Sequence, residues 1–268
     1  MIMNIKEIRN IEDESERVKA IYDVLNEDVR LRRNRAAGVE FFTTVKYIER
    51  YLKGGMKILE LGAGTGAYSL YFAKKGYSVA SVELSERNAD VLRSRIKNDM
   101  DIQLYCRNAL DLSVFPDRSF DVVLLFGPLY HLEREEDRRR CIFEAKRVLK
   151  DDGVMFFSFI SNDTTILSEI VQNDSFFKGS AYDHKTFKMS DFPFVLFTDE
   201  QCREMINGCG VQIVSAVGAD GISWLMEDKI GRMDDESFSQ YLRYHFYCCE
   251  KPDMLGRSLH LLYIGRKL

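Results

Sequence analysis

The residues with the clearest chemical potential form a short run in the first quarter of the chain. Glu60 is followed, one residue later, by Gly62-Ala63-Gly64-Thr65-Gly66. A glycine-rich turn lets a ligand approach the backbone closely because no Cβ intervenes. If a helix starts directly after the turn, its free N–H groups also point at a polar or anionic part of that ligand. The pattern therefore predicts a site for a nucleotide-like cofactor.

Two known phosphate-binding sequence patterns resemble this turn and have to be considered. The phosphate-gripping P-loop needs a Lys-Ser/Thr pair after its last glycine, and Ala67-Tyr68 stands there instead. The dinucleotide fingerprint G-x-G-x-x-G/A is met by Gly62, Gly64 and Ala67. A carboxylate at Glu60 would repel a pyrophosphate, which weighs against a dinucleotide.

The elements that must position this turn follow from the spacing of apolar runs. Such runs predict seven strands, over residues 56–61, 78–82, 102–106, 120–126, 154–160, 211–214 and 259–264. Amphipathic patterns between several of them predict helices. This alternation predicts an α/β fold, a doubly wound, mostly parallel seven-stranded sheet of the Rossmann-like kind. The ligand then lies across the carboxyl ends of the strands.

Candidate ligand-binding residues stand at or just past the ends of several predicted strands. Glu83 ends the second strand, where its carboxylate can accept hydrogen bonds from both hydroxyls of a ribose. Asn108-Ala109 follows the third strand, and Phe126 ends the fourth. All of these positions lie at the edge of the sheet where a ligand is expected.

Residues 56–160 resemble the class I S-adenosylmethionine (SAM)-dependent methyltransferases. The features that carry the resemblance are Glu60 before the glycines, Glu83, the pair Asn108-Ala109, and the phrase from Arg147 to Gly153 before the fifth strand. In that family the first acidic residue helps to hold the methionyl end of SAM. The third strand ends there in an Asp-Ala pair that contacts the adenine amino group. Asn108 departs from this pattern, and Asp111 is the substitute candidate.

The resemblance implies SAM as cofactor and methyl transfer as reaction. The residues that it assigns to the cofactor are Glu60, Gly62, Ala63, Gly64, Thr65, Gly66, Glu83, Leu84, Asn108, Ala109 and Phe126. A basic cluster at Arg30, Arg32, Arg33 and Arg35 precedes this region, and from it we expect Arg35 to pair with the methionyl carboxylate or with an anionic substrate.

Residues just past the fourth strand are candidates for the chemistry. Methyl transfer is an in-line displacement, and a general base is optional where the acceptor is already nucleophilic. If a base exists, His131 is the first candidate, because its ordinary pKa is near 6.5, and Tyr130 is expected to border the pocket. The segment Gly127-Pro128-Leu129-Tyr130 lacks the polar first residue found in methyltransferases that act on base amino groups.

Residues outside the sheet pattern divide the chain into a cap, a core and two inserts. An N-terminal helical cap is expected over residues 1–53 and a SAM-binding domain over 54–268, with inserts near 161–192 and 221–257. The inserts carry Trp224 and many other aromatic residues, so we expect them to close over a partly apolar, small acceptor. His184 and His245 would reach the site from these lids.

Composition narrows the class of protein further. The net charge is −4, which argues against a nucleic-acid partner, and apolar runs are shorter than a membrane span. Six cysteines without C-x-x-C spacing fit a reducing, cytoplasmic protein, and no metal motif is apparent. A monomer or homodimer is expected. An NAD(P)-dependent oxidoreductase on a similar sheet and a non-catalytic SAM-binding module are the alternatives.

Overall fold

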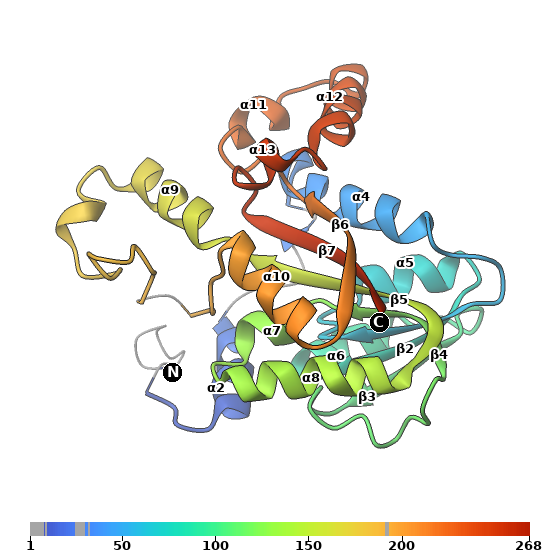
Figure 1. Cartoon of the computed structure of the whole chain (residues 1–268). Helices are drawn as coiled ribbons and strands as arrows, with labels where there is room; N and C mark the ends of the chain where they lie inside the picture. The colour runs from blue at the N-terminus through green and yellow to red at the C-terminus, as the bar shows by residue number, and fades with distance from the viewer. Residues whose placement is uncertain (1–7, 9, 25–29, 32, 191–192) are drawn as a thin grey trace.

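A seven-stranded sheet forms the centre of the molecule in the computed structural model, which describes residues 8, 10–24, 30–31, 33–190 and 193–268 (Figure 1). The strand order is β3-β2-β1-β4-β5-β7-β6. The strands are β1 (Lys57–Leu61), β2 (Ser78–Glu83), β3 (Ile102–Cys106), β4 (Phe120–Leu125), β5 (Leu149–Ile160), β6 (Val211–Gly218) and β7 (His260–Lys267). β7 runs antiparallel to both neighbours, and the pairs among β1–β5 are parallel. The predicted seven-stranded, mostly parallel sheet is confirmed.

The helices follow the alternation that the sequence predicts and add shorter ones. The longer ones are α2 (Glu14–Val24), α4 (Arg35–Glu49), α5 (Ala67–Lys74), α6 (Glu86–Arg95), α8 (Glu135–Val148), α9 (Asn162–Gln172), α10 (Asp199–Gly208) and α12 (Asp235–Cys248). The shorter ones are α7 (Pro128–His131), η1 (Phe176–Lys178), α11 (Glu227–Gly231) and α13 (Pro252–Leu255).

Apolar side chains cover both faces of the sheet, as a doubly wound fold requires. On one face, residues of α8 and α10 such as Ile142 and Ile206 pack with Leu59 and Phe157 of the strands. On the other, residues of α4, α5 and α6 pack with the alternate strand positions, such as Ile58. Apolar packing thus buries the central strands on both faces of the sheet.

The carboxyl ends of the parallel strands meet at one edge of the sheet, which is where a ligand site is expected. β1, β2 and β4 end there at Leu61, Glu83 and Leu125. Because β7 is antiparallel, it begins at this edge, and His260 pairs with Ile160 at the end of β5. The edge therefore collects residues from both halves of the chain.

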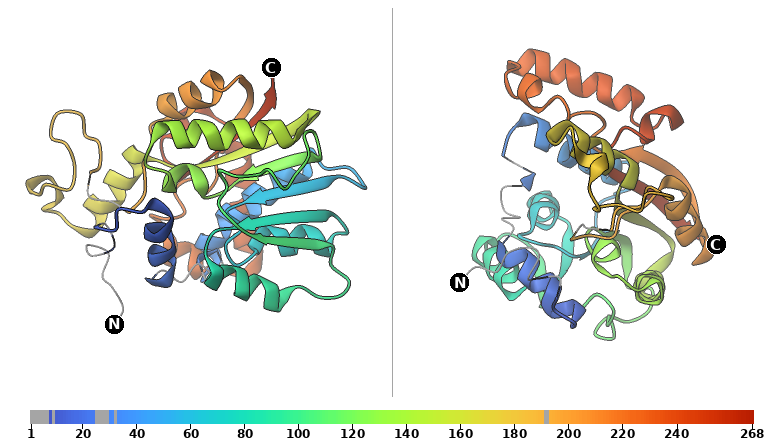
Figure 2. Two further views of the ribbon diagram at one scale, coloured as in Figure 1. Left: turned by 90° about the horizontal axis from the view of Figure 1, so that it is seen from below. Right: turned by 90° about the vertical axis from the view of Figure 1, so that its left-hand side faces the viewer.

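The two predicted inserts lie at different places. The segment of α9 and η1 projects from the body of the molecule, whereas α11, α12 and α13 gather near α4 (Figures 1 and 2). α4 packs against α11 and α12, and α2 packs against α6. None of the helices in the described part of the chain is both long enough and apolar enough to cross a bilayer.

Candidate functional site

The glycine turn between β1 and α5 has the backbone that its sequence requires. Gly62, Gly64 and Gly66 have φ of 77°, 55° and 87°, in the left-handed region that favours glycine. A Cβ on Gly62 would lie 2.6 Å from the carbonyl oxygen of Phe126. A Cβ on Gly66 would lie 2.2 Å from Leu92, so this glycine serves the packing of α5 on α6. The turn thus combines close approach at Gly62 with helix packing at Gly66.

Glu60 is buried at the end of β1, with 1% of its surface exposed, and still lines a cavity beside the turn. Its carboxylate accepts a hydrogen bond from Ser69, whose hydroxyl also lies 2.6 Å from that of Ser81. Burial raises the pKa of Glu60 to about 8, against the effect of the Ser69 hydrogen bond. Such a carboxyl becomes a carboxylate readily when a cation is placed beside it.

Glu83 joins the end of β2 to the turn. Its carboxylate accepts the Gly64 N–H at 2.7 Å and the Ser85 N–H at 2.8 Å. It also lines a second cavity together with Leu84. Burial raises the pKa of Glu83, although these backbone hydrogen bonds oppose the shift.

Asn108 and Ala109 line the same second cavity, as the sequence predicts. The amide nitrogen of Asn108 donates to the Ser15 hydroxyl at 3.1 Å, and its oxygen accepts the Leu110 N–H at 2.9 Å. Asp111 is exposed and lines neither cavity beside the turn. The structure therefore keeps Asn108 as the candidate and removes its substitute.

Two cavities flank the turn and share Tyr22 and Gly62 as walls. Their volumes, open mouths included, are about 750 Å³ and 570 Å³. The main cavity is lined by Tyr22, Arg30, Leu31, Glu40, Thr44, Glu60, Gly62, Ala63, Gly64, Thr65, Ala67, Tyr68, Phe126, Tyr130, Ser158, Ala219 and Leu262. The second is lined by Glu14, Ser15, Val18, Tyr22, Gly62, Val82, Glu83, Leu84, Arg107, Asn108, Ala109, Gly127, Pro128, His131 and Leu132.

The N-terminal cap forms one wall of both cavities. From α2, Ser15 and Val18 line the second cavity, and Tyr22 stands where the two cavities meet. From α4, Glu40 and Thr44 line the main cavity. Leu25, which the sequence groups with these helix positions, lies outside the described residues.

His131 and Tyr130 lie on opposite sides of this junction. The Tyr22 hydroxyl is 2.7 Å from His131 Nε2, while His131 Nδ1 is buried without a hydrogen-bond partner among the described residues. Burial lowers the pKa of His131 to about 3, so its ring is neutral and a weaker base than the ordinary value near 6.5 implies. Tyr130 lines the main cavity, and its ring packs against Phe194.

The basic cluster of the N-terminal segment is divided by the structure. The guanidinium of Arg35 donates to the Met233 carbonyl and to Asp235, each at 2.6 Å, and lines a separate groove rather than the cavities at the turn. Arg30 is the member that lines the main cavity. Arg32 lies outside the described residues. The sequence shows the cluster but not which arginine faces the turn.

The described residues of the two inserts contribute nothing to the walls of the main and second cavities, contrary to the expectation of aromatic lids. His184 is exposed, and His245 is buried within its own segment, beside Gly221. Trp224 lines a side cavity, which shares Arg30 and Glu40 with the main one. The expected lid is formed by the N-terminal cap instead.

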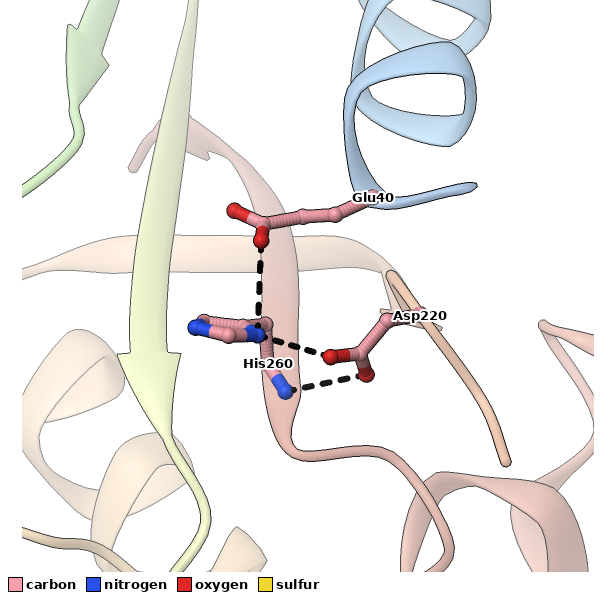
Figure 3. A group of neighbouring side chains, drawn as sticks. All are labelled: Glu40, Asp220 and His260. Atoms are coloured by element: carbon pink, nitrogen blue, oxygen red, sulfur yellow. Dashed lines mark hydrogen bonds and ion pairs between the residues drawn. The ribbon is translucent and has the colours of Figure 1, made fainter. Parts of the chain in front are cut away.

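One group of three potential ligand side chains occurs in the described part of the chain: Glu40, Asp220 and His260 (Figure 3). Their nearest ligand atoms lie within 4.8 Å of one another. Arg30 already pairs with Glu40 at 2.6 Å, and a cation bound here would face that guanidinium. The group therefore resembles an ion-pair cluster more than a metal centre. Its three residues lie far apart in sequence, so no sequence motif could have identified it.

The chemistry of the two cavities fits SAM. Glu60 offers a buried carboxyl group that suits an ammonium group, and Gly62 lines both cavities. Glu83 and Asn108 offer polar atoms in the adjoining cavity. A pyrophosphate would supply no cation to pair with the buried carboxyl group of Glu60.

Comparison with known proteins agrees with this chemistry. A family model described as a methyltransferase domain matches residues 59–157. A Bacillus subtilis protein named as a methyltransferase, YqeM, is 27% identical to this chain. The match covers 63% of this chain and 78% of YqeM. A demethylmenaquinone methyltransferase of Tropheryma whipplei is 26% identical over 60% of this chain and 68% of its own.

The fold is also found among solved structures. A SAM-dependent methyltransferase of Methanosarcina mazei superposes with a TM-score of 0.55 at 21% identity. The match covers 83% of this chain and 97% of that one. The agreement therefore extends over most of the chain and not only the glycine turn.

Proposed function

Because this chain is a class I SAM-dependent methyltransferase, we propose that it methylates a small molecule bound in the main cavity. The observation that carries the proposal is the wall that the N-terminal cap places over the strand ends, with Tyr22, Glu40 and Thr44 lining the cavity. A cavity covered in this way by the N-terminal cap suits a small acceptor, whereas a macromolecular substrate needs an open groove. The name of the Tropheryma whipplei relative refers to a small-molecule acceptor, which supports the same class.

The cofactor would extend across both cavities. Glu60 would hold the methionyl ammonium, and Arg30 stands in the same cavity for the methionyl carboxylate. Glu83 and Leu84 would contact the ribose, and Asn108 and the neighbouring Ala109 the adenine, under the wall formed by Ser15. Since Tyr22 and Gly62 line both cavities, the sulfonium centre would lie near them.

When bound, SAM supplies a methyl group that is already electrophilic, so the protein mainly has to align the acceptor with it. We assign this positioning to the far walls of the main cavity, formed by Phe126, Tyr130 and Leu262. Positioning of this kind can lower a barrier by roughly 7–11 kcal/mol.

His131 fits a supporting role better than that of a strong general base. With a pKa of about 3, its ring accepts a proton only from a strongly acidic group. Its bond to the Tyr22 hydroxyl instead fixes the cap where the cavities meet. We therefore propose that His131 positions Tyr22 and that Tyr130 contacts the acceptor.

The proposal is tested with purified protein, SAM carrying a labelled methyl group, and a cell extract separated into metabolite, protein and RNA fractions. Label in a molecule of the metabolite fraction is expected. Label in protein or RNA alone would refute the small-molecule acceptor. Titration with S-adenosylhomocysteine (SAH), with NAD as control, checks the cofactor site independently.

A further inference from the structure

Four charged side chains meet at the edge of the main cavity where the acceptor is proposed to bind. Glu40 comes from α4, Asp220 from the turn after β6, and His260 from the start of β7 (Figure 3). Arg30, from the segment before α4, pairs with Glu40. Glu40 and Arg30 line both the main cavity and the side cavity behind it. The motif residues of the cofactor site include none of the four.

Hydrogen bonds hold the side chain of Asp220 in place within this cluster. It is buried, with 6% of its surface exposed. Its Oδ1 accepts from the Ser258 hydroxyl at 2.6 Å and from the N–H groups of Leu259 at 2.9 Å and His260 at 3.1 Å. Its Oδ2 lies 2.7 Å from His260 Nδ1. Four hydrogen bonds hold it as a carboxylate, so Nδ1 of His260 carries the proton between them.

His260 connects Asp220 to the N-terminal cap. The same Nδ1 lies 3.4 Å from Glu40 Oε2, so the ring stands between two carboxylates. Glu40 in turn receives both terminal nitrogens of Arg30, at 2.6 and 3.2 Å. A continuous path of charge contacts therefore runs from the β6–β7 end of the sheet to the N-terminal segment.

The charges balance only when His260 is protonated on both nitrogens. Two carboxylates and one guanidinium leave one negative charge without compensation, and an uncompensated buried charge is costly. Burial by itself disfavours the imidazolium, but Glu40 and Asp220 outweigh it and raise the pKa of His260.

The other titratable groups around the cluster do not change this balance. On α12, Tyr241 and His245 face Asp220, but burial raises the pKa of the first and lowers that of the second, so both are neutral. In the side cavity, Arg33 and Glu227 pair with each other at 2.6 Å.

We propose that the charged form of His260 is the positioning element that holds Glu40, and with it Arg30 and α4, over the main cavity. The inference deepens the proposed function and rests on it for the ligands that the main cavity takes. The contacts themselves depend on neither SAM nor an acceptor. Since the folded-state pKa is raised, the stabilisation is complete below the ordinary pKa of histidine. It is lost as pH rises through the raised value.

The test compares wild type with His260→Gln and with the matched control His184→Gln, an exposed histidine of the projecting segment. Urea unfolding between pH 6 and 9 is expected to show His260→Gln less stable than wild type at pH 6, with the gap closing at alkaline pH. The control should follow wild type throughout. Hydrogen exchange of the α4 amides, relative to those of α8, should lose at least roughly tenfold protection in His260→Gln at pH 6.

A second measurement decides the matter even if the variant does not fold. The ring signals of the four histidines in the wild-type chain can be followed by NMR as the pH is raised. The His260 signal should titrate above pH 6.5, with α4 protection falling over the same range. A midpoint at or below 6.5, or α4 protection that ignores the titration, would overturn the proposal. Stabilisation by added Zn²⁺ that EDTA reverses would also overturn it, in favour of a metal centre.

Discussion

Cofactor binding should expel a proton from Glu60. Burial raises the pKa of this carboxyl group to about 8, so about nine-tenths of the molecules are protonated at pH 7. The ammonium group of SAM or SAH, placed against it, favours the carboxylate. Returning the pKa to near 4.5 corresponds to about 5 kcal/mol of differential interaction, at about 1.36 kcal/mol for each pKa unit.

The assay is calorimetric titration with SAH in two buffers that differ in their enthalpy of ionisation. At pH 7 the difference in heat should correspond to about 0.9 protons released per SAH bound. Because the bound state favours the deprotonated carboxyl group, affinity should rise with pH. The rise should be roughly tenfold between pH 6 and pH 7, flattening as pH approaches 8. Measurements stay below pH 7.5, since the α-amino group of the ligand titrates above it.

Two variants separate Glu60 from its surroundings. Glu60→Gln should bind SAH more weakly and without proton release. Glu83→Gln, whose side chain lines the other cavity, should weaken binding while the release remains. Equal heats in the two buffers at pH 7 for the wild type would refute the reasoning, because Glu60 would then be ionised before the ligand arrives.

Three further substitutions test the walls of the site. Gly62→Ala should lower the free energy of unfolding by about 1–3 kcal/mol, because its Cβ would press on a backbone carbonyl at positive φ. Gly54→Ala, with no atom within 4 Å of its Cβ, should be nearly neutral in the same urea titration. Arg30→Met should weaken SAH binding about tenfold in calorimetry, whereas an equal loss with Arg35→Met would contradict the assignment. Tyr22→Phe should destabilise the chain by about 1–3 kcal/mol, because its buried histidine partner loses a hydrogen bond. Unchanged thermal unfolding of Tyr22→Phe would show that the bond is not formed in solution.

Much of the cofactor half could be predicted from the sequence because its signals are local. The turn at Gly62 follows from the short range of backbone sterics, and Glu60 and Glu83 are found because each directly follows or ends a predicted strand. In a parallel sheet, strand ends meet at one edge, so these positions come together in any fold of this class. The prediction of the sheet was accordingly confirmed in number and direction of strands.

The walls that come from outside the strand ends could not be predicted in this way. Charge patterning does not show which way the side chains of Arg30 and Arg35 point near the start of α4. It therefore cannot decide which of the two lines the main cavity. The burial that lowers the pKa of His131 below its ordinary value could not be predicted either, because it depends on tertiary packing. The aromatic inserts suggested lids, yet none of their described residues lines the main cavity or the second cavity. Residues of the N-terminal cap line both.

The amino-acid sequence by itself determined the sheet, the glycine turn and the acidic residues beside it. Each of these depends on interactions between residues close along the chain or on a repeated strand–helix order. Only the tertiary structure decided which residues line the main cavity and how Glu40, Asp220 and His260 share their charge. These contacts join residues that lie between 40 and 220 positions apart in sequence, and they exist because burial in the folded chain forces opposite charges to pair.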